Sequence, residues 1–272
     1  AVDEANEPSV VLGIEMALLN LWGESQVCGF RRFLNASAPD SITCNGLLVG
    51  TTEEIIHAAQ QMTSEGYVSL KLKVGSDSVE KEIARVEQLR SAIPTQVKLR
   101  LDANRSWDFK TAVTFGKEVE NQRIEYIEEP CADIGKLESL FDKTGIKYAL
   151  DESMAFVKPE QVARAYGLGA FIIKPTRFGL MRSFNAACTI KDLKITVVIS
   201  SSFESSLGLL ALSNLACAAA PRTACGLGTA GWFERDLITR PLISTGGRID
   251  LSQYDRTSVD VKKKSLSELS LD

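Results

Sequence analysis

The chain has 272 residues, of which 44% are hydrophobic and 24% charged, and its formal net charge is −4. This length and mix suit one large α/β domain, or one domain plus part of another, with a sizeable core. Dispersed Lys and Arg residues argue against nucleic-acid binding, and no apolar run approaches the roughly 20 residues that span a bilayer. The six cysteines form no Cys-x-x-Cys pair and His57 is the only histidine, which argues against a zinc site.

The first part of the chain, residues 1–43, does not share the pattern of the rest. Its apolar residues have helical spacing over Pro8–Trp22, which predicts a helix, and the segment from there to Pro39 is irregular. At the other end, residues 236–272 are rich in Ser and Lys. We interpret Lys262–Lys264 in this tail as a solvent-facing run and not as a binding patch.

Between these parts, short β-rich runs alternate with helical patterns such as Thr52–Glu65, which contains His57, and Ser78–Ile93. Such alternation favours parallel β/α units, and about eight strands favour a (β/α)8-type TIM barrel in its (β/α)7β form. An open doubly wound sheet is the alternative, but it would have a Gly-rich phosphate turn after its first strand, where this chain has Gly50 followed by two threonines. The predicted strands are Cys44–Val49, Ser69–Val74, Val97–Asp102, Ile124–Glu128, Lys147–Asp151, Phe171–Lys174, Thr196–Ser200 and Thr223–Gly226.

Three lysines are predicted to lie at the mouth of this barrel. Lys71 and Lys73 alternate with leucines, so both face the same side of their strand. A solvated strand edge would explain them, but that fits poorly with a parallel barrel strand buried on both faces. Beside carboxylates and a metal, such lysines can be tuned toward neutrality and act as a general base. Lys174 ends the sixth strand and approaches from the opposite side of the ring.

Three carboxylates end three consecutive strands: Asp102, Glu128 and Asp151. Because barrel enzymes place their chemistry at the C-terminal ends of the strands, these side chains should converge. Each alone could be a strand-end cap or a salt-bridge partner. Together they favour a Mg²⁺ site, since Mg²⁺ prefers oxygen ligands, and Mn²⁺ could substitute. The predicted chemistry is removal of a proton next to a substrate carboxylate, followed by elimination or reprotonation.

The motifs that carry these residues resemble the muconate-lactonizing branch of the enolase superfamily, and within it the o-succinylbenzoate synthases. The similarity runs from about Pro8 to Trp232. The Ser-rich segment Val198–Gly208 is the part most like the synthases, and Gly226–Thr229 fits the end of the eighth strand. The other landmarks are Lys71-x-Lys73, Asp102-Ala-Asn104, Ile127-Glu-Glu-Pro130, Asp151-Glu-Ser153 and Ile173-Lys-Pro-Thr176.

This resemblance implies a role for each residue. The three carboxylates would bind Mg²⁺. Lys73 would remove the proton and then assist the loss of hydroxide as water, Lys174 would stabilise the enolate from the opposite face, and Lys71 would support Lys73. A small-molecule carboxylate, 2-succinyl-6-hydroxy-2,4-cyclohexadiene-1-carboxylate, would be dehydrated to 2-succinylbenzoate, a precursor of menaquinone or phylloquinone. The residues implied to hold its succinyl carboxylate are Ser200, Ser201, Ser202, Glu204 and Gly226.

The resemblance also implies a domain organisation. Family members carry an N-terminal α+β capping region, so residues 1–43 would be a capping remnant and linker and residues 44–235 the catalytic barrel. Residues 236–272 would be a tail that packs on the cap side or is disordered. In plants and algae such a synthase occurs in a larger chain with other domains of the quinone pathway, and a start without Met agrees with that origin or with a fragmentary gene model. The expected location is the chloroplast stroma in a plant or alga and the cytoplasm in a bacterium.

Two other hypotheses stay open. An N-succinylamino acid racemase or a dipeptide epimerase would use the same metal site and opposed lysines. The segment Gly226–Gly231 lacks the acidic Asp-x-Asp typical of dipeptide epimerases, which disfavours that activity but not racemisation. The third hypothesis is an inactive barrel kept as a structural domain of a fused protein.

Overall fold

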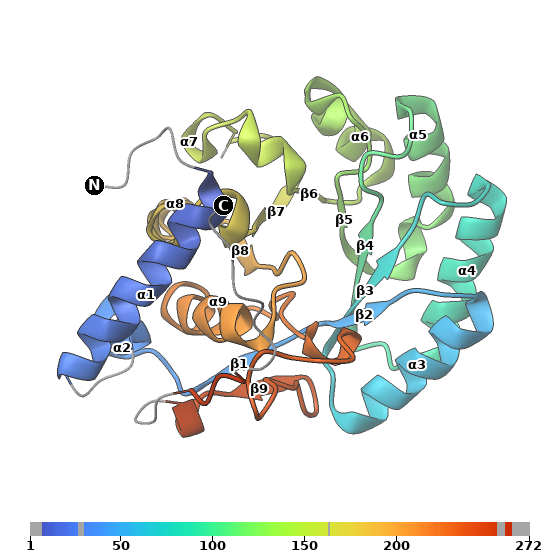
Figure 1. The fold of residues 1–272 in the computed structure, drawn as a ribbon. Coiled ribbons are helices and arrows are strands. Elements are labelled where there is room, and N and C mark those ends of the chain that lie inside the picture. The colour runs from blue at the N-terminus through green and yellow to red at the C-terminus, as the bar shows by residue number, and fades with distance from the viewer. Residues whose placement is uncertain (1–6, 27–29, 163, 255–258, 263–272) are drawn as a thin grey trace, which may run out of the picture.

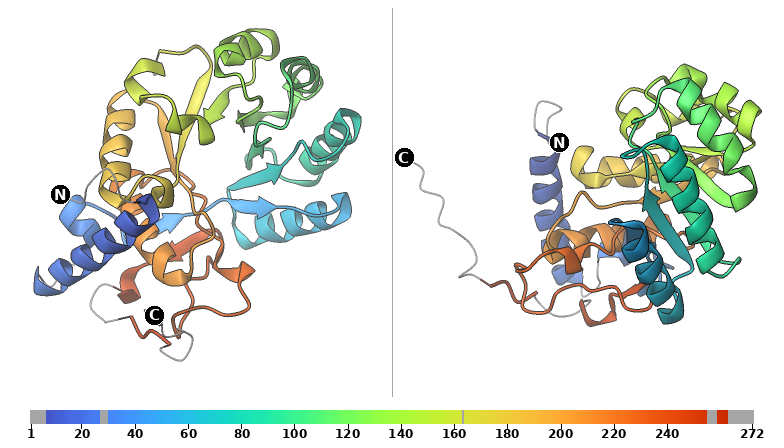
Figure 2. Two further views of the ribbon diagram at one scale, coloured as in Figure 1. Left: turned by 45° about the horizontal axis from the view of Figure 1, so that its top comes forward. Right: turned by 90° about the vertical axis from the view of Figure 1, so that its right-hand side faces the viewer.

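The computed structural model describes residues 7–26, 30–162, 164–254 and 259–262. A parallel sheet curls around a central axis, with helices on its outside (Figures 1 and 2). Each strand pairs with the next one in the chain. In order, the strands are β2 (Gly46–Leu48), β3 (Ser69–Lys73), β4 (Lys98–Asp102), β5 (Ile124–Glu128), β6 (Tyr148–Leu150), β7 (Leu168–Ile173) and β8 (Thr196–Ile199).

The eighth strand is reduced to two residues that close the ring. Cys225 forms a parallel bridge with Cys44, and Gly226 forms one with Ser200. The Cys225 N–H donates to the Thr43 carbonyl at 2.8 Å, and the Gly226 N–H donates to Ile199 at 2.9 Å. A Cβ on Gly226 would lie 2.5 Å from Ser200 Oγ, so a larger residue here would have to displace that hydroxyl. The predicted barrel is therefore confirmed, with a short closing seam between Cys44 and Ser200.

Each crossover carries a helix, as the (β/α)7β pattern requires. The first of them begins with a capping box, in which Thr51 and Glu54 exchange side-chain and backbone hydrogen bonds, and ends at Gly66 in a left-handed conformation. The helices are α3 (Thr52–Glu65), α4 (Val79–Ala92), α5 (Phe109–Glu118), α6 (Leu137–Thr144), α7 (Pro159–Val162), α8 (Leu180–Asp192) and α9 (Ser206–Ala219). Short 3-10 turns complete the loops: η1 (Glu120–Gln122), η2 (Ile134–Lys136), η3 (Glu152–Ala155), η4 (Pro175–Arg177), η5 (Ala230–Trp232) and η6 (Ser252–Tyr254).

The N-terminal helices cover one side of the barrel. Helix α1 (Pro8–Gln26) contacts α8, and α2 (Phe30–Leu34) contacts α9. Helix α9 is apolar on nearly every face and almost entirely buried, so it needs this second layer. The Glu15 carboxylate of α1 accepts hydrogen bonds from Leu180 N at 2.6 Å and Met181 N at 3.2 Å, which ties α1 to the N-terminus of α8.

The interior of the barrel has its own small core. Tyr126, Ala149, Ala170, Ile172 and Val198 form a buried cluster separate from the main core between strands and helices. Along β7, Ala170 and Ile172 belong to this inner cluster, whereas Phe171 and Ile173 belong to the outer one. This alternation is the one expected for a barrel strand. These side chains thus fill part of the interior, and a cavity lies toward the mouth.

Residues after the barrel return to its N-terminal edge. Strand β9 (Arg248–Asp250) pairs antiparallel with β1 (Ser41–Thr43), and Ile42 and Ile249 are buried between them and the core. The division into capping remnant, barrel and tail stays a prediction. Among the residues that the structure describes, no helix combines the length and apolarity that crossing a membrane demands.

Candidate active site

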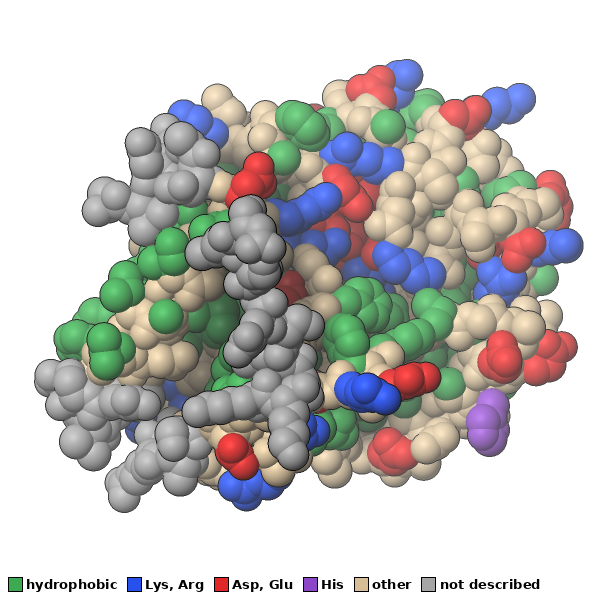
Figure 3. Space-filling view, in the orientation of Figure 1, with side chains coloured by type: hydrophobic (Ala, Val, Ile, Leu, Met, Phe, Trp, Pro, Cys, Tyr) green, Lys and Arg blue, Asp and Glu red, His purple; other side chains and the backbone are tan. Residues whose placement is uncertain are grey.

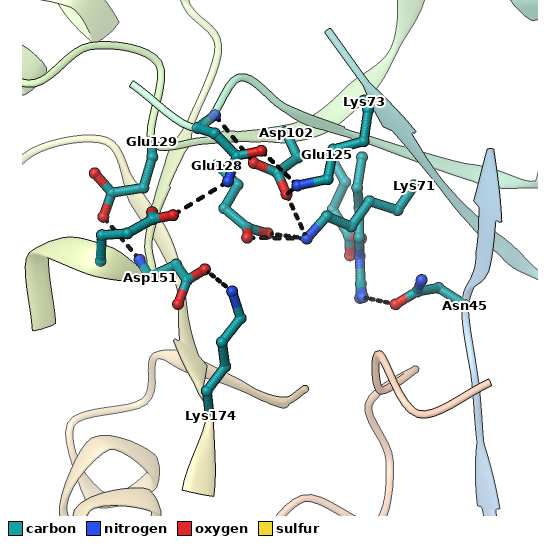
Figure 4. A network of polar contacts seen from close by, with 12 residues as sticks. Asn45, Lys71, Lys73, Asp102, Glu125, Glu128, Glu129, Asp151 and Lys174 are labelled. Carbon is teal, nitrogen blue, oxygen red and sulfur yellow. Dashed lines mark hydrogen bonds and ion pairs between the residues drawn. The ribbon is translucent and has the colours of Figure 1, made fainter. Parts of the chain in front are cut away.

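Charged side chains from five successive strands meet at the mouth of the barrel. Figure 3 shows Lys, Arg, Asp and Glu side chains gathered in a hollow near the middle of this face, with hydrophobic side chains below it. Figure 4 shows the lysines and carboxylates pointing toward one another. The pairing of the parallel strands brings these strand ends together, since Lys73 of β3 lies beside Asp102 of β4, and Asp102 lies beside Glu128 of β5.

The two lysines of β3 both bind carboxylates. Lys71 Nζ lies 2.9 and 2.8 Å from the two oxygens of Glu128 and 2.8 Å from Asp102 Oδ2. Lys73 Nζ lies 2.6 Å from the same Asp102 oxygen and also donates to the side chain of Asn104. The Lys71 side chain is 12% exposed and that of Lys73 40%, so Lys73 is the one that reaches the open mouth.

Lys174 lies across the site from β3, directly after β7. Its ammonium forms an ion pair with Asp151 Oδ2, and Arg177 Nη1 lies 3.9 Å from the other oxygen of Asp151. The cavity of about 90 Å³ between the strands is lined by Lys71, Lys73 and Lys174 together. A small substrate in this cavity would therefore have an ammonium on each side.

Burial and opposite charges set the ionisation of the cluster. For Lys71, burial acts to lower the pKa, but the charges of Glu128 and Asp102 and the hydrogen bonds to them outweigh it, and the pKa is raised. Our expectation that Lys71 is tuned toward neutrality is therefore not met. Burial opposes ionisation of Asp102, yet Lys71 and Lys73 hold its pKa below the usual value.

The other two carboxylates are shifted the opposite way. Burial raises the pKa of Glu128 to about 8, aided by the charges of Asp102 and Asp151 and opposed by Lys71. Burial also raises the pKa of Asp151, opposed by Lys174. Lys71 keeps a charged partner in either state of Glu128, because Asp102 is ionised. A cation bound between the carboxylates would favour the charged forms of Glu128 and Asp151.

The donor set suits a hard cation. Asp102, Glu128 and Asp151 supply oxygen ligands only, and all three are almost fully buried at the ends of neighbouring strands. Their lysine partners hold them apart: within the described ranges, no three Asp, Glu, His or Cys side chains are grouped closely enough to enclose a metal ion. The chemistry of the residues fits Mg²⁺, and their side chains would have to turn from the lysines toward it.

Glu129, next to Glu128, joins three strand ends. It is fully buried, and its backbone φ is +44°, an uncommon conformation for a non-glycine residue. One carboxylate oxygen accepts from Asp151 N at 2.9 Å and Ser153 N at 2.7 Å. The other accepts from Ser153 Oγ at 2.9 Å and Arg105 Nε at 2.9 Å. Glu129 thus fixes the turn that carries Asp151.

The residues predicted to hold the substrate carboxylate fall into two groups. Ser200, Ser201 and Gly226 line the cavity. Glu204 is not among the lining residues; its carboxylate accepts from the Ser202 N–H at 3.1 and 2.8 Å and from the Thr176 hydroxyl. In this arrangement Glu204 shapes the Ser-rich loop, and Ser202 takes part through its backbone.

Sequence reasoning did not single out several lining residues: Asn45, Leu47, Phe203 and Thr229. A signal was present for two of them. Asn45 and Leu47 alternate in the first predicted strand, so the period-two rule that placed Lys71 and Lys73 would have placed them on one face. Phe203 gave no such signal, because it belongs to a loop.

The family follows from comparison with known proteins. Residues 54–258 match the model of the enolase C-terminal domain-like family, and the chain belongs to this family. Within it, the chain is 30% identical over 242 residues to the o-succinylbenzoate synthase of Thermobifida fusca, with 87% of this chain and 73% of that protein covered. It is 35% identical over 237 residues to the synthase of an Enterobacter species, with 86% and 69% covered. The resemblance to this group of enzymes is confirmed.

Three further similarities place the chain in context. It is 33% identical over 269 residues to the chloroplastic protein PHYLLO of Arabidopsis thaliana, where 86% of this chain matches only 16% of that protein. The N-succinyl Arg/Lys racemase of Bacillus cereus has the same fold with a TM-score of 0.85 at 20% identity, over 98% of this chain and 73% of the racemase. A dipeptide epimerase from Cytophaga hutchinsonii, with a TM-score of 0.83 at 20% identity over 96% of this chain and 73% of that one, is described as a complex with Mg and a dipeptide.

Proposed function

We propose that the chain is an o-succinylbenzoate synthase, which dehydrates 2-succinyl-6-hydroxy-2,4-cyclohexadiene-1-carboxylate to 2-succinylbenzoate with Mg²⁺. The observation that carries the proposal is the placement of Lys73 and Lys174 on opposite sides of one small cavity beside three buried carboxylates. The similarity to the o-succinylbenzoate synthases named above supports the same activity. The product is aromatic, so the reaction is strongly downhill.

Asp102, Glu128 and Asp151 would hold the Mg²⁺. When bound, the ion would supply positive charge to the substrate carboxylate, whose negative charge increases as the neighbouring proton leaves. Lys73 would act as the base in the state in which it is neutral and no longer paired with Asp102. Ser200, Ser201 and the backbone at Gly226 would hold the succinyl carboxylate at the other end of the cavity.

Lys73 would carry both proton transfers. Its neutral amine removes the ring proton next to the carboxylate, and the electron pair of that C–H bond shifts toward the carboxylate to give an enolate. The resulting ammonium then protonates the leaving hydroxyl on the same face. The enolate pair returns to form the ring double bond as the C–O bond breaks and water departs. Lys174 would stay charged on the other face and stabilise the enolate. No oxidant or reductant is needed.

We also propose that the chain works in menaquinone or phylloquinone biosynthesis, where 2-succinylbenzoate is a precursor. The match to a short part of the Arabidopsis protein PHYLLO supports an arrangement in which this barrel is joined to other domains of the pathway. The partners would then be those domains and the small carboxylates that pass between them.

Racemisation of N-succinylamino acids is the second candidate. It is favoured by the same pair of opposed lysines and by the fold shared with the N-succinyl Arg/Lys racemase. Racemisation requires both lysines to exchange protons, one on each face, whereas syn dehydration requires proton transfer only from Lys73. The two activities therefore place different demands on Lys174.

The test is an absorbance assay of aromatisation with purified protein, the cyclohexadiene substrate and Mg²⁺, run beside racemisation of N-succinylamino acids. We expect rapid aromatisation that the Lys73→Ala variant loses while its circular dichroism spectrum stays that of the wild type. Turnover by Lys73→Ala near the wild-type rate would refute the assignment of the base. Racemisation without aromatisation would replace the first candidate by the second.

A further inference from the structure

Phe203 is the aromatic side chain of the active-site cavity. The cavity is otherwise lined by charged and polar groups, small residues and Leu47. The two lysines of β3 and Asp102 lie on one side, Lys174 lies opposite them after β7, and Phe203 belongs to the loop that follows β8. The lining is therefore mainly charged and polar, and Phe203 gives it an apolar surface at the loop after β8. A ligand that matches this lining combines anionic groups with an apolar part that can contact Phe203.

The backbone at Phe203 is in an unfavourable conformation. Its φ is +64°, in the left-handed region that bulky side chains rarely adopt. Glu204 holds the loop in this shape: its carboxylate accepts both hydrogen bonds from Ser202 N and the hydroxyl of Thr176, in the turn after β7. Strained positions persist where their surroundings determine them, and they concentrate at functional sites.

Phe203 also stays half in solvent, although it is a large apolar residue. It is 50% exposed, and it makes an edge-to-face contact with Trp232, which is 52% exposed, at 6.1 Å between ring centroids. Trp232 comes from η5, beyond the closing seam. Two half-exposed rings from different loops thus lie against each other. Folding alone gains little from this arrangement, whereas a bound ring would cover the exposed face of Phe203.

We propose that Phe203 is a specificity-determining residue that contacts the flat, unsaturated ring of a cyclic carboxylate substrate, with Glu204 as the residue that positions it. This inference rests on the proposed function for the identity of the ring, and it adds the residue that would select a ring over an acyclic chain. Phe203 takes no part in proton transfer. Its contribution is the apolar contact that keeps the ring between Lys73 and Lys174.

The experiment compares Phe203→Ala and Phe203→Gly with Phe33→Ala. Phe33 is a matched control, because it is also 50% exposed and also pairs with a tryptophan, Trp22, but does not line the cavity. The probe is 2-succinylbenzoate, titrated calorimetrically in the presence of Mg²⁺, and the thermal midpoint of each variant is measured. The KM and kcat for the cyclohexadiene substrate are measured in the same preparations.

Both Phe203 variants should bind 2-succinylbenzoate about tenfold more weakly, the effect of uncovering part of an aromatic contact. KM should rise by a similar factor while kcat changes far less. The Phe203→Gly variant should melt no lower than the wild type, because glycine adopts the left-handed conformation freely. Phe33→Ala should bind as the wild type does. Glu204→Gln should weaken binding in the same direction as the Phe203 variants.

Unchanged binding and KM in Phe203→Ala would overturn the proposal. So would a lower melting temperature in Phe203→Gly together with equal losses in Phe33→Ala, since that would make Phe203 a structural residue. Failure of the wild type to aromatise the substrate, with 2-succinylbenzoate binding still dependent on Phe203, would refute the proposed function and leave this inference standing. Absence of 2-succinylbenzoate binding by the wild type would overturn both.

Discussion

Glu129 is the residue whose substitution should show how far the shape of the site depends on one buried carboxylate. In Glu129→Ala, the buried N–H groups of Asp151 and Ser153 lose their common acceptor. An unsatisfied buried donor costs about 1–3 kcal/mol, so two of them cost about 3 kcal/mol after partial relaxation. Arg105 adds less, because it keeps its 2.7 Å hydrogen bond to Ser153 Oγ and part of its side chain reaches solvent. For a domain of this size the thermal midpoint should fall by about 6–12 °C.

The assay combines thermal unfolding with Mg²⁺ titration by calorimetry. Because the turn of Asp151 is released, Mg²⁺ affinity should fall by about 10–100-fold, the usual effect of losing a residue that orients a ligand. Glu87→Gln is the control, since Glu87 is an exposed residue of α4. A Glu129→Ala variant that melts and binds Mg²⁺ like this control would refute the reasoning that Glu129 holds the site together.

Three further outcomes are expected. EDTA should stop aromatisation and Mg²⁺ or Mn²⁺ should restore it; turnover that survives EDTA would remove the three carboxylates from the mechanism. Because burial raises the pKa of Glu128 to about 8, Mg²⁺ binding near pH 7 should release a proton and tighten as pH rises toward that value, with the carboxylate ionised in the complex; equal calorimetric heats in buffers of different ionisation enthalpy would contradict this. Lys174→Arg should keep part of the dehydration activity but lose racemisation, because arginine retains the charge and does not exchange protons; equal losses in both assays would count against a purely electrostatic role.

Much of the site could be predicted because its parts obey simple periodicities. The alternation of Lys71 and Lys73 with leucines, and the positions of the acidic residues at strand ends, depend only on the two-residue repeat and on the parallel arrangement of the strands. Strand β7 begins at Leu168, earlier than the predicted Phe171, because Gly169 and Ala170 have low strand propensity and hid its start. The eighth strand was predicted as four residues and is formed by two.

The electrostatics and the loops could not be predicted in the same way. The raised pKa of Lys71 depends on distances to Asp102 and Glu128 that a linear sequence does not contain. Glu129 was visible only as part of a motif, since its hydrogen bonds reach residues more than 20 positions away. The left-handed conformation of Phe203 belongs to a loop in which Glu204 accepts hydrogen bonds from Thr176 and Ser202. No rule of local propensity would place a phenylalanine in that conformation.

Two cysteines, Cys44 and Cys225, pair at the short closing seam of the barrel, and their reaction with a thiol reagent would report opening of the ring there. Burial raises the pKa of Cys225 to about 11 and that of Cys44 as well, so neither thiol ionises or meets a reagent while the ring is shut. Cys188, which is partly exposed on α8, offers an internal reference. The difference in labelling rate between Cys188 and the two seam thiols would measure how often the barrel opens locally at the seam. The same seam sets the position of Ser200 and Gly226, which line the cavity.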